Sequence, residues 1–252
     1  MKVKFKNIIC LTIISFWSLI ITAQSEKWVM VSKSDMAKVF EEMNNWFKNT
    51  SSYSLTITHA SFQDYKTSVP SEKSVGYFKK DKDNYHSFLL GIHTIQNTFY
   101  KIVIDTSEKI LMVANPDQLV WNSYTLEDYT FILKNCSTIK VAENGMGKRY
   151  RIEFEGSSSI GSYEFVFNTA GLLKEVVSYF NQEIEKNEDD KNSPKVKPRI
   201  SIAFSEYKIA PFLVYKEEFD ESNYFTQKNN ILIPIARYIN FRLNDQRLYK
   251  TK

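Results

Sequence analysis

The fold of this protein is decided by the stretch Lys148-Arg149-Tyr150-Arg151-Ile152-Glu153-Phe154. Its apolar residues alternate with charged ones, so that Tyr150, Ile152 and Phe154 fall on one face of an extended chain. A period of two is typical of a half-buried β-strand. The same alternation recurs in the segments 163–167, 173–179 and 200–204. These four segments predict an antiparallel meander with one apolar and one wetter face.

The first half of the chain contains further short strand-like segments. They are 53–59, 76–80, 85–90, 101–105 and 110–114, and a last strand is expected from about 237 to 243. Two amphipathic helices are also predicted, one from Met36 to Phe47 and one from about Leu126 to Asn135. We therefore predict an α+β fold in which about two helices cover a single large curved antiparallel sheet, an incomplete β-barrel.

Residues 1–23 are typical of a secretory signal peptide. Lys2, Lys4 and Lys6 precede an apolar run from Ile8 to Ile21, which is short for a membrane-spanning helix. An uncleaved anchor is the alternative. We expect residues 24–252 to form a single exported β-rich domain, periplasmic or else secreted or leader-anchored. The segment 181–199 holds five acidic and five basic residues and is predicted to be a disordered charged loop.

Charge and motifs exclude several classes of function. The net charge of +4 falls to about +1 without the three lysines of the leader, so a nucleic-acid partner is not expected. The chain contains no G-x-S-x-G, G-x-G-x-x-G, phosphate-binding loop, CxxC or H-E-x-x-H motif. His86 and His93 are the only close histidine pair, and we expect neither a metal site nor a cofactor. The interpretation is a protein without catalytic activity.

Large apolar side chains are abundant instead. The chain holds 18 Phe, 15 Tyr and 4 Trp, and some apolar residues are consecutive, as in Phe88–Leu90 and Ile102–Ile104. Consecutive apolar residues in a strand indicate cover on both faces, by a helix, a ligand or a partner. The candidates for an apolar cavity are Leu55, Ile57, Phe78, Phe88, Leu90, Trp121, Leu126, Tyr129 and Leu133, the last three on the second helix.

The order of these elements resembles that of the outer-membrane lipoprotein carriers. A leader and an amphipathic helix precede a strand that begins at Tyr53, and the stretch Gly76-Tyr77-Phe78-Lys79-Lys80 looks like a characteristic strand of that family. Aromatic strands, a hairpin at 101–115, a helix after Trp121 and a closing meander follow. The resemblance covers most of residues 33–243. It implies an incomplete barrel, closed by helices, with an apolar cavity for acyl chains.

Two functions are expected from these observations. The first is a non-enzymatic periplasmic carrier that buries acyl chains of a lipid or lipoprotein, each buried methylene contributing about 0.8 kcal/mol. The alternative is a structural or assembly component of an envelope protein complex, its cavity filled by its own side chains. Neither function requires a transmembrane segment once the leader is removed.

Overall fold

The computed structural model describes residues 27–116, 129–156, 158–186, 193–209 and 216–247. The leader predicted at 1–23 lies outside the described residues, as do two of the cavity candidates, Trp121 and Leu126.

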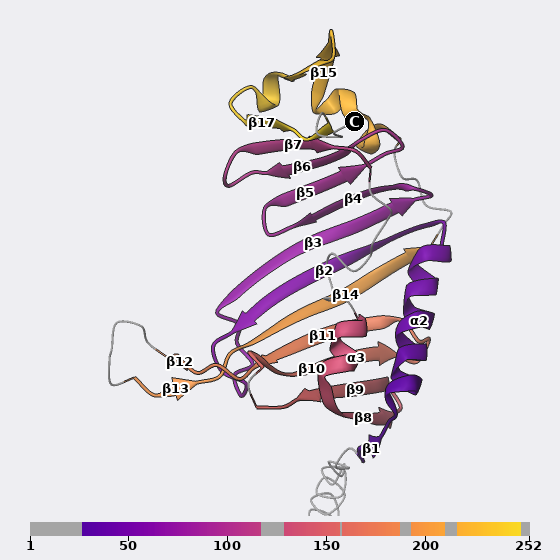
Figure 1. The fold of residues 1–252 in the computed structure, drawn as a ribbon, viewed down its shortest axis with the longest axis vertical. Coiled ribbons are helices and arrows are strands. Elements are labelled where there is room, and N and C mark those ends of the chain that lie inside the picture. Colours follow the sequence, from indigo (N-terminus) through magenta and orange to yellow (C-terminus); the bar gives the residue numbers. More distant parts are fainter. Residues whose placement is uncertain (1–26, 117–128, 157, 187–192, 210–215, 248–252) are drawn as a thin grey trace, which may run out of the picture.

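One open, curved sheet of 13 strands forms the body of the molecule (Figure 1). Its strands in spatial order are β1 (Val29–Met30), β8 (Cys136–Asn144), β9 (Gly147–Phe154), β10 (Ile160–Asn168), β11 (Leu173–Phe180), β14 (Arg199–Ile209), β2 (Ser52–Phe62), β3 (Glu72–Asp81), β4 (Asn84–Leu89), β5 (Ile92–Gln96), β6 (Lys101–Asp105), β7 (Ile110–Ala114) and β17 (Arg242–Asp245). All neighbours pair antiparallel except β17, which runs parallel to β7. The predicted α+β class with one curved antiparallel sheet is confirmed.

Helix α2 (Lys33–Asn49) covers one face of this sheet. Ser32 caps its N-terminus: the Ser32 hydroxyl accepts a hydrogen bond from the Asp35 backbone N–H at 3.1 Å. Its buried stripe packs on Tyr53, Leu55, Ile57 and the strands beyond them, and consists of Met36, Phe40, Met43 and Phe47. The short helix α3 (Tyr129–Asn135) joins the same core, where Tyr129 stacks on Phe40 with 4.5 Å between ring centroids. We call this side of the sheet the helix face.

The C-terminal segment covers the opposite face at the other end of the sheet. It comprises η2 (Lys216–Phe219), η3 (Glu221–Asn223), β15 (Phe225–Lys228), β16 (Ile231–Pro234) and η4 (Ala236–Tyr238). Its apolar side chains form a second core with Ile95, Ile102, Ile104, Leu111 and Val113 of β5 to β7. We call this side the cap face. The consecutive apolar residues of β6 therefore alternate between the two faces of the sheet.

Several elements differ from the sequence-based expectation. The strand expected at 237–243 is divided, because η4 ends with the buried Tyr238 and β17 begins only at Arg242. Cys136, which directly follows the helix predicted at 126–135, is the first residue of β8 and is a buried free thiol. Within the charged segment 181–199, β12 (Ile184–Glu185) pairs with β13 (Lys195–Val196), and residues 187–192 are outside the described part. No described helix is long and apolar enough to cross a membrane.

Candidate functional site

Five of the predicted cavity residues lie together on the helix face. Leu55, Ile57 and Phe78 are at most 2% exposed beneath α2. Tyr129 and Leu133 of α3 are partly buried at the border of the same core, and the Tyr129 hydroxyl donates to Asn44 Oδ1 at 2.9 Å. The part of the sheet under α2 is thus filled by side chains of the protein itself.

The structure places two other candidates elsewhere. Phe88 pairs with Tyr77 of β3, so it lies on the cap face and not on the face of Phe78; its ring is 4.5 Å from that of His93. Leu90 lies in the turn between β4 and β5, has a φ of 52° and is 47% exposed. The run of consecutive apolar residues conceals which of them share a face, and this is the physical reason for both differences.

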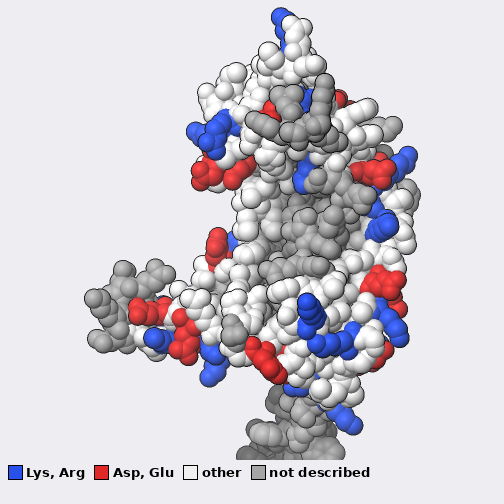
Figure 2. Space-filling view, in the orientation of Figure 1, with Lys and Arg blue, Asp and Glu red and all other residues white. Residues whose placement is uncertain are grey.

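Beyond α2, the helix face carries apolar side chains on β4, β6 and β7, with the polar Ser87, Thr94 and Gln96 among them. Tyr85, Leu89, Val103 and Met112 lie on it, all half-buried. Tyr85 and Leu89 adjoin the core under α2. We call these four residues the acyl strip. Among the residues that the structure describes, no helix covers the acyl strip. Figure 2 shows the molecule hollowed along one side between its two ends.

A polar pocket of about 290 Å³ lies on the cap face, where β14, β2, β3 and β4 meet the C-terminal segment. Its lining residues are Ser54, Leu55, Thr56, Tyr77, Lys79, His86, Glu206, Lys208 and Glu218. Two lysines and two glutamates face one another there, so the formal charges of the lining cancel. The pocket differs in this respect from the apolar surface on the other side of the same strands.

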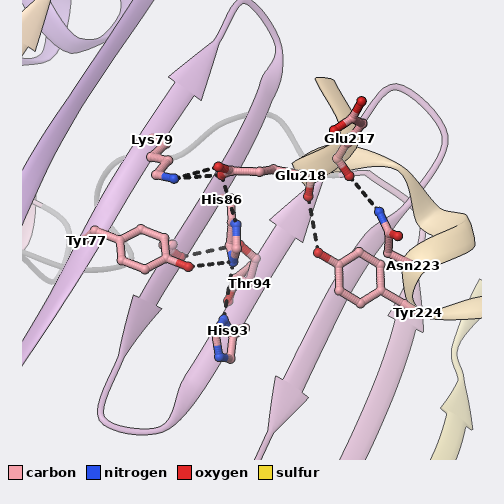
Figure 3. A network of polar contacts seen from close by, with 10 residues as sticks. Tyr77, Lys79, His86, His93, Thr94, Glu217, Glu218, Asn223 and Tyr224 are labelled. Carbon is pink, nitrogen blue, oxygen red and sulfur yellow. Dashed lines mark hydrogen bonds and ion pairs between the residues drawn. The ribbon is translucent and has the colours of Figure 1, made fainter. Parts of the chain in front are cut away.

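Glu218 of η2 connects the C-terminal segment to this pocket (Figure 3). Lys79 Nζ donates to both oxygens of its carboxylate, at 2.7 and 2.8 Å. Glu218 Oε2 also lies 3.6 Å from His86 Nδ1, which is buried and makes no hydrogen bond. The ion pair is partly shielded from water, because the side chains of Lys79 and Glu218 are 31% and 25% exposed.

His86 and its neighbours form the inner part of the network. His86 Nε2 lies 3.2 Å from the Tyr77 hydroxyl and 3.2 Å from His93 Nδ1. Burial, together with nearby His93, lowers the pKa of His86 to about 4 against the attraction of Glu218. Burial also raises the pKa of Tyr77, so both groups are neutral near pH 7. The described residues offer no group of three or more His, Cys, Asp or Glu side chains arranged to hold a metal ion.

A β-bulge in β14 turns two charged side chains toward the pocket. The register against β2 shifts between Ser205 and Lys208, and Glu206 within the bulge has a φ of 52°. Thr56 Oγ1 donates to Glu206 Oε2 at 2.8 Å. A non-glycine residue in this region of φ costs on the order of 1 kcal/mol or more, which the surrounding structure must offset.

Of the residues that line this pocket, the sequence singled out His86, as one of a close histidine pair, and Leu55, as a candidate for an apolar cavity. Lys79 is 139 positions from Glu218, and no local pattern relates them. The charges of Lys79 and Lys208 were visible in the sequence, but their common face follows from a strand pairing across more than 120 residues. The single available signal was the presence of polar residues at alternate positions of strands whose other face is apolar.

Comparisons with known proteins add a likeness of fold. No family model matches the sequence, and no curated protein matches it. An uncharacterized conserved protein from Thermus thermophilus is similar in structure at 9% identity and a TM-score of 0.38, over 71% of this chain and 90% of that one. A putative outer membrane lipoprotein-sorting protein domain from Vibrio parahaemolyticus is similar at 8% identity and a TM-score of 0.32, over 73% and 96% of the two chains.

A third solved structure is a LolA superfamily protein from Nitrosomonas europaea. It is similar at 9% identity and a TM-score of 0.31, over 74% of this chain and 97% of that chain. The likeness to each of these solved structures extends over about three quarters of this chain. At these identities and TM-scores it is a partial likeness in the arrangement of the sheet, and it is not evidence of a ligand.

Proposed function

We propose that this protein is exported and binds acyl chains of a lipid or lipoprotein along the acyl strip, without catalysing a reaction. The observation that carries the proposal is the half-buried apolar surface of Tyr85, Leu89, Val103 and Met112, which adjoins the core under α2. The neighbouring Leu55 and Phe78 are already covered by α2. An acyl chain is therefore expected beside the helix and not beneath it.

Hydrophobic burial suffices for such binding. Each methylene taken from water contributes about 0.8 kcal/mol, so a chain that lays about ten methylenes on the strip gains roughly 8 kcal/mol before the cost of association is subtracted. No charged partner is needed for this contact. The polar heads of the ligand can remain in water, and ligands with different heads are expected to bind with similar affinity.

Export is proposed on the evidence of residues 1–23 alone. Cleavage after Ala23 leaves Gln24 as the first residue. Mass spectrometry of the protein recovered from its own cells measures this directly. A mature chain that retains Met1 in the cytosolic fraction would contradict export.

A role as an assembly component of an envelope complex is the second candidate function. One observation favours it: in the sheet under α2, Ile57 and Phe165 are fully buried by other side chains of the protein. The acyl strip would then contact another protein. Purification without detergent would recover a stoichiometric partner in that case.

The two functions are separated by a binding titration with a pyrene-labelled fatty acid. Val103→Asp and Met112→Asp place a carboxylate on the acyl strip, and we expect each to weaken binding about tenfold or more because the charge must stay hydrated. Val75→Asp is the matched control, since Val75 is 55% exposed on the cap face of β3. Equal affinity in all three variants, or no saturable binding by the unmodified protein, refutes acyl binding on this surface.

A further inference from the structure

The polar pocket contains a row of four side chains that crosses four adjacent strands. Lys208 of β14 pairs with Ser54 of β2, Ser54 pairs with Lys79 of β3, and Lys79 pairs with His86 of β4. Neighbouring strands are about 4.8 Å apart, and directly paired residues share a face. The two ammonium groups therefore flank a hydroxyl on one surface, within reach of a single small anion.

The next row along the strands has a different chemistry. Thr56 of β2 pairs with Tyr77 of β3, and the bulge adds Glu206 beside them. These side chains supply a carboxylate and two hydroxyls. A ligand with an anion on the first row would meet hydrogen-bond acceptors on the second, which suit a hydroxyl or ammonium group in the same molecule.

Two groups of the first row have no partner among the described residues, and a third makes only a long contact. Among the described residues, Lys208 makes no ion pair or hydrogen bond, and the Ser54 hydroxyl makes no hydrogen bond. His86 is 9% exposed and borders the pocket, and its Nδ1 makes no hydrogen bond but lies 3.6 Å from Glu218 Oε2. A buried polar atom without a partner costs free energy that a ligand can recover.

The remaining group, Lys79, already holds an anion. The carboxylate of Glu218 accepts two hydrogen bonds from Lys79 Nζ and faces His86 Nδ1 (Figure 3). Glu218 comes from the C-terminal segment and not from the sheet. It occupies the position that an anionic ligand on this row would take.

We propose that this pocket binds the phosphate group of a small phosphate ester that also carries a hydroxyl or ammonium group. The phosphate lies between Lys79 and Lys208, with Glu218 as an internal competitor for Lys79. Two lysines and a hydroxyl, without arginine, suit a phosphate bound by point charges better than a carboxylate held in bidentate geometry. The site is separate from the acyl strip, which lies on the other face of the sheet, on β4, β6 and β7.

Isothermal titration of the full chain tests this site. The soluble probes are glycerol 3-phosphate and phosphoethanolamine, with glycerol and ethanolamine as their phosphate-free counterparts. Phosphatidylglycerol vesicles, compared with phosphate-free diacylglycerol–galactolipid vesicles, test the same group in a lipid head. Saturable binding of the soluble esters identifies a free phosphate ester as the source, and binding only of the phospholipid vesicles identifies a lipid head; both support a phosphate site.

Two variants with opposite expected effects make the test specific. Lys208→Met should weaken phosphate binding about tenfold, whereas Lys174→Met, an exposed lysine of β11, should leave it unchanged. Glu218→Gln should strengthen binding about fivefold, because the competing charge is removed. A purely structural Lys79–Glu218 pair predicts no gain.

The proposal is overturned by three results: no saturable binding of any phosphate probe, equal binding of the phosphate-free counterparts, or equal loss in the two lysine variants. Titration of the same variants with the pyrene-labelled fatty acid keeps the two functions apart. Acyl binding should be unaffected by Lys208→Met, so either function can fail while the other stands.

Discussion

Replacing Lys80 by Met should destabilise the protein, because the Lys80 side chain caps the C-terminal end of α2. Lys80 is 5% exposed, and its ammonium group donates to the backbone carbonyls of Phe47, Lys48 and Thr50 at 2.9, 2.9 and 3.0 Å. The last carbonyls of a helix have no partner within it, and a cation there also interacts favourably with the helix dipole. Lys80 satisfies three carbonyls at the end of α2 at once.

The size of the effect follows from these contacts. A hydrogen bond to a charged group contributes about 1.5–3 kcal/mol, and three such bonds would sum to well over 4 kcal/mol if they were independent. Burial of the ammonium opposes them, as the lowered pKa of Lys80 shows, with desolvation as the first cause. We expect Lys80→Met to lower the free energy of unfolding by about 3 kcal/mol, within a range of roughly 2–5.

Urea unfolding at pH 7, followed by circular dichroism and by tryptophan fluorescence, measures this difference. With a slope of about 2–3 kcal/mol per molar urea, the midpoint should fall by about 1 M or more. Lys73→Met is the matched control, because Lys73 lies on the same strand and is exposed; its effect should stay within about 0.5 kcal/mol. A loss below about 1 kcal/mol for Lys80→Met, or equal losses in the two variants, would refute the reasoning.

Three further outcomes are expected. The pKa of His86 is about 4 in the folded protein and near 6.5 in the unfolded chain. Between these two values the unfolded chain binds a proton that the folded protein does not bind, so the free energy of unfolding falls as the pH drops from 6.5 toward 4. His86→Gln should therefore reduce, by about 2 kcal/mol, the loss of stability that is measured between pH 7 and pH 5. Gly76→Ala should lower the free energy of unfolding by about 3 kcal/mol or prevent folding, because a Cβ atom at this position would lie 1.9 Å from the Phe88 carbonyl oxygen. Thermal unfolding measures the change, and a loss below about 1 kcal/mol would contradict the prediction. Cys136 is 5% exposed and burial raises its pKa, so a thiol reagent should modify it slowly in buffer and rapidly in urea, and equal rates would contradict the structure.

The strands that the sequence predicts are those in which alternation is strict. Residues 148–154 lie within β9, and Tyr150 and Ile152 are buried as expected. Helix α2 could be predicted equally well, because its apolar residues recur at the helical period and Ser32 precedes it. In both cases the local pattern and the tertiary environment agree, which is the condition under which a sequence can be read without a structure.

Short or doubly covered strands were harder to read. The strand β5, Ile92–Gln96, was not predicted, because its sequence Ile-His-Thr-Ile-Gln does not alternate between apolar and polar residues. β8 was missed because Cys136 falls in phase with the preceding helix while its backbone is already extended. In 88–90 the apolar residues are consecutive, so no alternation shows that Phe88 faces the cap. The C-terminal segment that covers this face is more than 120 residues away in the sequence.

The polar pocket was beyond sequence reasoning for a related cause. Its residues come from four strands and one short 3₁₀ helix, and all of them except Leu55 are ordinary polar residues when each is taken alone. His86 could be singled out as part of a pair with His93. Its actual carboxylate neighbour, Glu218, was not visible, because the fold alone brings them within 3.6 Å.

Strand β3 explains how α2 and the C-terminal segment attach to opposite faces of one sheet. Lys79 and Lys80 are consecutive, so their side chains point to opposite faces: Lys79 holds Glu218 of the C-terminal segment, and Lys80 holds the end of α2. A slip of one residue in the register of β3 would exchange these two lysines and break both attachments. The close approach at Gly76 to the Phe88 carbonyl group admits no side chain at that position and thereby opposes such a slip. The register of β3 against β2 and β4 is therefore the feature on which the polar pocket, the acyl strip and the seat of α2 all depend.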